Sequence, residues 1–164
     1  MHMVDYEKGQ KILMSAETYN GLVARSTTDV VMRIWSFPSI EPYKSWTVFK
    51  DKKNYFLRSI VWDQLAKIFT TDLITYGTEK QVGEDIIDPL LNELESIKIP
   101  PFENVNTIGL DGVTSGVERV NRMVSASVNW WCDTPNTWKP LQLWHENAII
   151  QLDKFLPICT TDLK

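Results

Sequence analysis

The sequence TIGLDGVTSGVERVNRMVSASVNWW, residues 107–131, predicts a β-meander that places its two neighbouring tryptophans on opposite faces of a sheet. Asn121 and Arg122 are the candidates for a two-residue turn, because asparagine readily adopts a positive φ. That turn would pair residue 120 with residue 123, and residue 118 with residue 125. The stretch therefore predicts two adjacent antiparallel strands with a defined register.

Side chains alternate along a strand, so this register gives the stretch one apolar face and one polar face. The apolar face contains Val113, Val117, Val124, Ala126, Val128 and Trp130. The polar face contains Thr114, Gly116, Glu118, Ser125, Ser127, Asn129 and Trp131. A slip of one residue on either strand would bring its polar residues onto the core, so the clean division supports this register.

Length and composition predict a single globular domain over residues 1–164. Hydrophobic residues make up 43% of the chain and charged residues 23%, and no run approaches the roughly 18 apolar residues of a membrane span. The first ten residues lack the basic start and apolar centre of a secretory signal. We therefore expect a cytoplasmic protein with no membrane partner.

Neither a disulfide framework nor a metal or cofactor site is predicted. Cys132 and Cys159 form no CxxC pair, and His145 is the one histidine beyond position 2. The sequence contains no glycine-rich dinucleotide motif and no P-loop. The net charge of −4, with basic residues scattered along the chain, disfavours nucleic acid as a partner.

Three further segments predict strands. Residues 30–37 are rich in β-branched and aromatic residues, and residues 46–49 and 55–62 predict a hairpin in which Val48 faces Leu57. Both faces of this hairpin are apolar, so we expect it at the centre of the sheet. The later meander, with one polar face, is expected nearer an edge.

Apolar residues at helical spacing predict two main helices. The first covers residues 79–97, either as two helices that meet at Asp88-Pro89 or as one kinked helix. The second follows residues 133–137 and carries one apolar stripe. The stripe consists of Leu141, Trp144, Ala148, Leu152 and Phe155. A short helix after Ser15 is also expected, whereas residues 63–76 give no firm assignment.

These elements predict an α+β fold class. We expect an antiparallel sheet of five or six strands, packed against the two main helices in a single layer.

Two catalytic motifs are approached but not matched. His145-Glu146 resembles the start of the HExxH zinc-protease helix, but Ile149 occupies the second histidine position. Ser115 is one place from the centre of the Gly112 to Gly116 segment and lies in a predicted strand, so the GxSxG nucleophile elbow is also absent.

The polar face of the meander is the candidate binding site. Its residues are Glu118, Ser127, Asn129 and Trp131, with Asp111 at the adjoining bend and His145 from the final helix. A carboxylate, a hydroxyl, an amide and an indole on a rigid sheet can bind a polar ligand or a partner. The same set is typical of a solvated sheet face, on which only the large Trp131 side chain is unusual.

Three classes of function remain open. Seven tryptophans, mild acidity and the lack of a catalytic motif favour a non-catalytic protein that binds another macromolecule. The partner we expect is a protein, for example the target of an inhibitor or immunity-type protein. A small hydrolase or ligand-binding enzyme would use Glu118 or Asp111 with His145, in a pocket that holds a carboxylate with a raised pKa. A self-associating subunit, and hence a homo-oligomer, is the third class.

Overall fold

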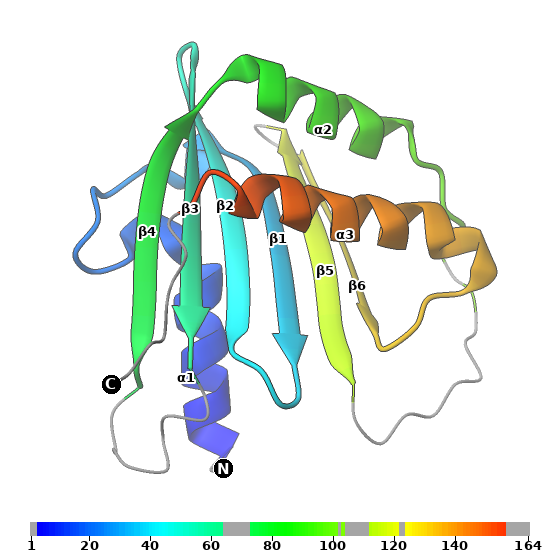
Figure 1. Cartoon of the computed structure of the whole chain (residues 1–164), viewed down its shortest axis with the longest axis horizontal. Helices are drawn as coiled ribbons and strands as arrows, with labels where there is room; N and C mark the ends of the chain where they lie inside the picture. The colour runs from blue at the N-terminus through cyan, green and yellow to red at the C-terminus, as the bar shows by residue number, and fades with distance from the viewer. Residues whose placement is uncertain (1–2, 64–72, 102, 104–111, 122–123, 157–164) are drawn as a thin grey trace.

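A computed structural model describes residues 3–63, 73–101, 103, 112–121 and 124–156 of the chain (Figure 1). The strands are β1 (Val30–Pro38), β2 (Tyr43–Asp51), β3 (Asn54–Trp62), β4 (Thr75–Val82), β5 (Val113–Asn121) and β6 (Val124–Trp131). The helices are α1 (Met3–Met14), α2 (Glu84–Ser96) and α3 (Lys139–Asp153), with short 3-10 helices at Ala16–Thr18, Thr27–Asp29 and Asn136–Trp138. Within the described residues, the strands form one antiparallel sheet in the order β4-β3-β2-β1-β5-β6. The α+β fold class is confirmed.

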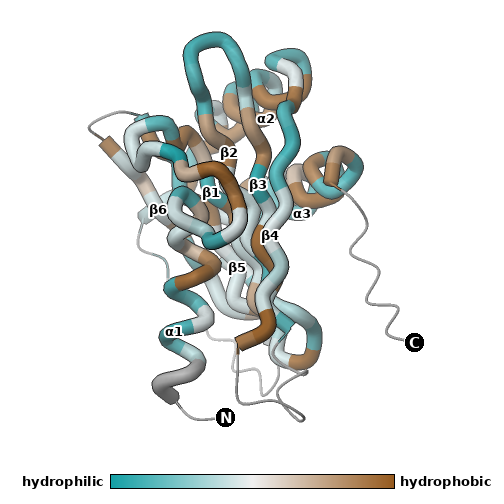
Figure 2. Tube along the Cα trace, turned by 90° about the vertical axis from the view of Figure 1, so that its left-hand side faces the viewer, coloured by the Kyte–Doolittle hydropathy of each residue, from teal (hydrophilic) through white to brown (hydrophobic). Residues whose placement is uncertain are grey.

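Helices lie on both faces of this sheet. In Figure 1, α2 and α3 cross in front of the strands and α1 lies behind them. Figure 2 shows the sheet from the side, with α1 on one side of it and α2 and α3 on the other. Here the face under α2 and α3 is called the α2/α3 face, and the opposite one the α1 face. Each face has its own apolar cluster, one around Trp46 and Trp144 and the other around Phe49 and Trp62.

The expected single layer of two helices is α2 and α3, and α1 is an addition to it. The reason lies in β2 and β3, whose side chains are apolar on both faces and therefore need cover on both sides. Leu13 of α1 is fully buried, and its carbonyl accepts a 2.7 Å hydrogen bond from the Ser45 hydroxyl of β2. This contact fixes α1 on the sheet.

The predicted central hairpin is confirmed, including its register. Val48 pairs with Leu57, and β2 and β3 are interior strands. The predicted start of the next helix at residue 79 is wrong, because residues 79–82 belong to β4 and α2 begins at Glu84. Pro89 lies inside α2, which is one helix. The final helix is also confirmed, with Leu141, Trp144, Ala148 and Leu152 all buried.

The β5–β6 hairpin has the predicted faces but a register that differs by two residues. Glu118 pairs with Ser127 instead of Ser125, and Asn121 pairs with Val124. The predicted turn at Asn121-Arg122 is therefore wrong, because Asn121 is the last residue of β5; residues 122–123 lie outside the described residues. A shift by an even number keeps every side chain on its face, which is why the apolar and polar faces were assigned correctly.

None of the helices in the described part of the chain is both long enough and apolar enough to cross a bilayer.

Candidate functional site

Six side chains form a polar row that crosses the α1 face of the whole sheet. The strand registers align one residue from each strand. In order from β4 to β6 they are Glu79, Arg58, Thr47, Arg33, Glu118 and Ser127. The segment that joins α1 to β1 adds Glu17 and Arg25, which bond to members of the row. The three carboxylates and three guanidiniums balance, as charges removed from water require.

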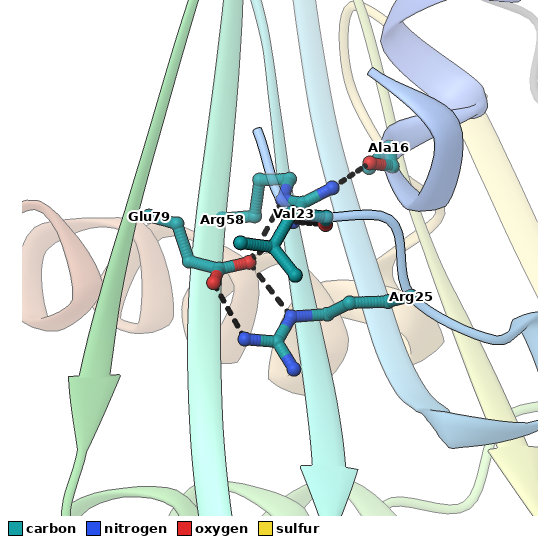
Figure 3. A network of polar contacts seen from close by, with 5 residues as sticks. All are labelled: Ala16, Val23, Arg25, Arg58 and Glu79. Carbon is teal, nitrogen blue, oxygen red and sulfur yellow. Dashed lines mark hydrogen bonds and ion pairs between the residues drawn. The ribbon is translucent and has the colours of Figure 1, made fainter. Parts of the chain in front are cut away.

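One half of this row is closed by the chain itself (Figure 3). Arg58 of β3 is fully buried and donates to the Glu79 carboxylate at 2.5 and 2.9 Å. The same guanidinium donates to the carbonyl oxygens of Ala16 and Val23. Arg25 adds two hydrogen bonds to Glu79, at 2.5 and 2.8 Å.

The electrostatics of Glu79 show that this closed half is a structural tie. Burial disfavours the Glu79 carboxylate, but hydrogen bonds from Arg25 and Arg58 outweigh burial and lower its pKa below the usual range. The Arg25 guanidinium also lies over the Phe56 ring, 3.8 Å from its centre. These groups are already committed to one another, so they are not available to a ligand.

The other half of the row is partly open. Arg33 bonds to the Glu118 carboxylate, and lies 3.3 Å from the Glu17 carboxylate. The Glu118 side chain is 21% exposed, and the hollow beside it has a volume of about 290 Å³. Val124 and Ser125 of β6 line the same hollow. The acidic end of the row is therefore accessible from β6.

Strand β6 is an exposed edge of the sheet. Within the described residues no strand pairs with its outer side, and its sequence, VSASVNWW, contains no charge. Ser127 and Asn129 are exposed on the α1 face, and Trp131 is 46% exposed. Three of the predicted site residues therefore lie together on one strand, and Glu118 pairs with one of them, Ser127.

At alternate residues of β6, the backbone amide and carbonyl groups are directed toward this open side. The Ser39 amide donates to the Gly112 carbonyl on the β1 side of β5, and the Cys132 amide donates to the Val113 carbonyl on the β6 side. Hydrogen-bonded and non-bonded pairs alternate along an antiparallel ladder. The even-numbered residues of β6 therefore bond to β5. Residues 125, 127, 129 and 131 direct their amides and carbonyls outward.

The remaining two predicted site residues do not join this group. His145 is buried on the α2/α3 face, where its ring Nε2–H donates to the Trp35 carbonyl at 3.0 Å and packs edge-on against Trp130. Burial lowers the pKa of His145, which favours the neutral ring. It is a core residue on the opposite side of the sheet from Glu118. Asp111 lies outside the described residues.

The sequence prediction missed the basic partners of the row. Arg33 and Arg58 each interrupt an otherwise apolar strand, VVMRIWSF and NYFLRSIVW. A single charge in the middle of a buried strand requires a buried partner, so this pattern was the available signal. Glu17 and Arg25 carried no such signal, because neither lies in a strand of the sheet.

A second hollow, of about 510 Å³, lies on the α2/α3 face beyond the end of α3. Lys44, Trp46, Tyr76 and Asp153 are among its lining residues. The Asp153 carboxylate accepts a 2.7 Å hydrogen bond from Trp46 Nε1 and lies 3.9 Å from Lys44 Nζ, so its charge is already engaged. The described residues contain no group of three or more His, Cys, Asp or Glu that could hold a metal ion.

Comparisons of the chain with protein-family models, with curated proteins and with solved structures each found no match.

Proposed function

We propose that this protein binds another protein, and that an extended segment of the partner adds to the open side of β6. The observation that carries the proposal is the uncharged edge of eight residues with alternate backbone groups directed outward. The role is non-catalytic and cytoplasmic, in the manner of an inhibitor or an immunity-type partner.

An open edge of this kind favours strand addition. Natural sheets protect their edges with lysine, proline, bulges or short strands, because unpaired amides and carbonyls recruit other strands. β6 contains no lysine and no proline, and it pairs with β5 without a bulge along its whole length. Each backbone hydrogen bond to a partner adds a net stabilisation of about 0.5–1.5 kcal/mol. Several such bonds give the affinity, and side chains beside the edge give the specificity.

Two large apolar side chains at the ends of β6 support a protein partner. Val124 is 70% exposed and Trp131 is 46% exposed. Val124 lines the hollow beside Glu118 at one end of β6, and Trp131 lies at the other end, so a partner that follows the edge can contact both. Aromatic anchors of this type dominate the binding energy of many interfaces.

The decisive variant is Ser127→Pro, which removes one outward amide. Residue 127 makes no ladder bond to β5, and proline is accepted on an edge strand at such positions. The matched control is Gln81→Pro on β4, the other edge. Asp63 donates to the Ile74 carbonyl in the β3–β4 ladder, so by the same alternation residue 81 also points outward.

The experiment is affinity capture from lysate of the source cells, with wild type, Ser127→Pro and Gln81→Pro as the three baits. The melting temperature of each bait is recorded first. We expect one stoichiometric partner with wild type and with Gln81→Pro, and its loss with Ser127→Pro. Equal capture by all three baits would show that β6 is not the contact. Sedimentation of the purified protein shows whether the partner is a second copy, the self-associating class.

Of the two residue pairs proposed for the enzyme alternative, Glu118 with His145 lacks support, and the other pair includes Asp111, which lies outside the described residues. Glu118 lies on the α1 face and His145 is buried beneath α3, so one substrate could not contact both. No other observation in the described residues favours a reaction.

A further inference from the structure

We infer that the partner segment carries a lysine or an arginine that passes over Ser127 and pairs with Glu118. This inference rests on the proposed function, and it names the chemistry of the partner that β6 selects. A protein with a basic segment in extended conformation is the expected occupant.

The first step of the argument is the order of charges along the polar row. From β4 to β6 the row reads carboxylate, guanidinium, hydroxyl, guanidinium, carboxylate, hydroxyl. A strand added to β6 contributes the next position, opposite Ser127. Directly opposed unlike charges are stabilising in sheets and like charges destabilising, and the nearest charge at that position is the Glu118 carboxylate. A cation continues the alternation.

The second step is the charge of the open hollow. Two carboxylates, Glu17 and Glu118, share the single guanidinium of Arg33, which leaves one negative charge in excess. Among the described residues, Arg33 is the one hydrogen-bond partner of the Glu118 carboxylate. That carboxylate has two oxygens, and the bond uses only Oε2. Oε1 is the acceptor that a basic side chain can use.

The third step is reach. Neighbouring strands lie about 4.8 Å apart, so a residue on the added strand is two such spacings from the backbone of Glu118. Ser127 is short, and its exposed side chain leaves the path above it open. Lysine and arginine lay their long apolar stems along a surface and place the charge at its end. A short side chain at that position would not reach Glu118.

A second copy of this chain is a poor fit. The segment that would add to β6 in a symmetric dimer is β6 itself, VSASVNWW, which has no lysine or arginine. The net charge of −4 on each copy also opposes self-association at low ionic strength. Both facts favour a basic partner.

The test uses a displayed library of random ten-residue peptides, selected on immobilised wild type and depleted on Ser127→Pro. We expect the retained peptides to share a lysine or arginine at one fixed position within a β-branched sequence. Synthetic peptides with that residue changed to glutamine should bind wild type about fivefold more weakly, the value of a partly exposed ion pair.

Two variants identify the carboxylate. Glu118→Gln should bind the basic and the glutamine peptides equally, and its melting curve shows whether it folds. Ser127→Lys places a cation next to Glu118 on an exposed site, should keep the fold, and should lose the preference for basic peptides in the same way. Its matched control, Ala126→Lys, places the cation at an exposed position on the opposite α2/α3 face, so it should retain the preference.

The outcomes separate the two proposals. Peptides that depend on the β6 edge but show no basic residue, or a basic preference that persists in both Glu118→Gln and Ser127→Lys, would overturn this inference and leave strand addition in place. A selection that yields no peptide sensitive to Ser127→Pro would overturn both.

Discussion

The two edge strands of the sheet, β4 and β6, have the same length and differ in what covers them. The α1 face of β4 is covered by the segment between α1 and β1, through the Glu79 ion pairs and through Tyr19, whose hydroxyl donates to Thr75 at 3.1 Å. The side chains of β6 are exposed at six of eight positions.

This difference distinguishes a carboxylate that stabilises the fold from a carboxylate that a partner can reach. Both edges end the same polar row, with one carboxylate on β4 itself and the other on β5 next to β6, and each carboxylate is bonded to an arginine. At β4 the carboxylate is enclosed by two arginines, whereas at the β6 end it keeps an exposed side and an uncharged strand beside it. A buried ion pair thus ties the first edge, and the second edge remains open to a partner.

The largest expected effect comes from making the same substitution at both ends of the row. Glu79→Ala leaves the fully buried Arg58 without its carboxylate and should lower the free energy of unfolding by about 3–5 kcal/mol. Glu118→Ala should cost about 1 kcal/mol, because Arg33 keeps Glu17 as a partner and the Glu118 side chain is partly exposed. Urea denaturation followed by tryptophan fluorescence measures both, and equal losses would contradict the contrast.

A smaller effect is expected from filling the space under Tyr19. A Cβ atom at Gly77 of β4 would lie 2.2 Å from the Tyr19 ring, so that ring packs directly on the glycine. Gly77→Val should therefore destabilise the protein by about 1–3 kcal/mol through overpacking. Ser125→Val on β6 is the control, and it should leave the thermal midpoint nearly unchanged. A normal midpoint for Gly77→Val would mean that Tyr19 does not cover β4.

The pH dependence of the free energy of unfolding should show the contribution of the Glu79 carboxylate. Its pKa is lowered in the folded protein, whereas the unfolded chain titrates at about 4.3. Between these two pKa values the unfolded state holds more protons, so the contribution of Glu79 is complete above the unfolded pKa and is lost as pH falls through the folded one.

Glu79→Gln removes that contribution at every pH. The stability difference between wild type and Glu79→Gln should therefore shrink as the pH is lowered from 6 to 3, an acid range chosen to span about 4.3. Parallel stability curves from urea titrations at each pH would refute the role of the Arg25 and Arg58 hydrogen bonds.

The smallest effect on stability is expected on β6. Trp131→Ala should change the free energy of unfolding by about 0.5 kcal/mol or less, as for most surface substitutions, while it weakens capture of the partner. A large loss of stability would place the indole in the core of the fold. Iodide quenching of Trp131 fluorescence, compared with the same variant, checks its exposure independently.

The sequence was sufficient for the elements whose side chains alternate or recur cleanly. The β2–β3 hairpin, the strand at residues 30–37 and the stripe of α3 were all predictable because the apolar pattern admits one arrangement of faces. The β5–β6 register was not, since pairing Glu118 with Ser125 or with Ser127 satisfies the same pattern. Turn residues had to decide it, and Asn-Arg is a weak turn signal.

Strand β4 and the position of α1 could not be predicted for a different reason. β4 has few apolar residues, so its sequence does not show the alternation of a strand. Because Val82 continues the helical spacing of the apolar residues in α2, the sequence favoured a helix that begins before Glu84. α1 has a mixed composition, and only the burial of both faces of β2 and β3 calls for it. For the candidate site, Ser127, Asn129 and Trp131 were grouped correctly by alternation, whereas His145 lies on the other face because helix geometry alone does not say which side of a sheet a helix covers.

The alternation of backbone directions along β6 also sets how quickly its amide hydrogens exchange with solvent. Amides of residues 126, 128 and 130 are held by β5 carbonyls, so their exchange requires an opening of the ladder. Amides of residues 125, 127, 129 and 131 face water and can exchange without any opening. In deuterated solvent, β6 should thus label at every second residue within the first moments, and a bound segment would convert that alternating pattern into uniform protection.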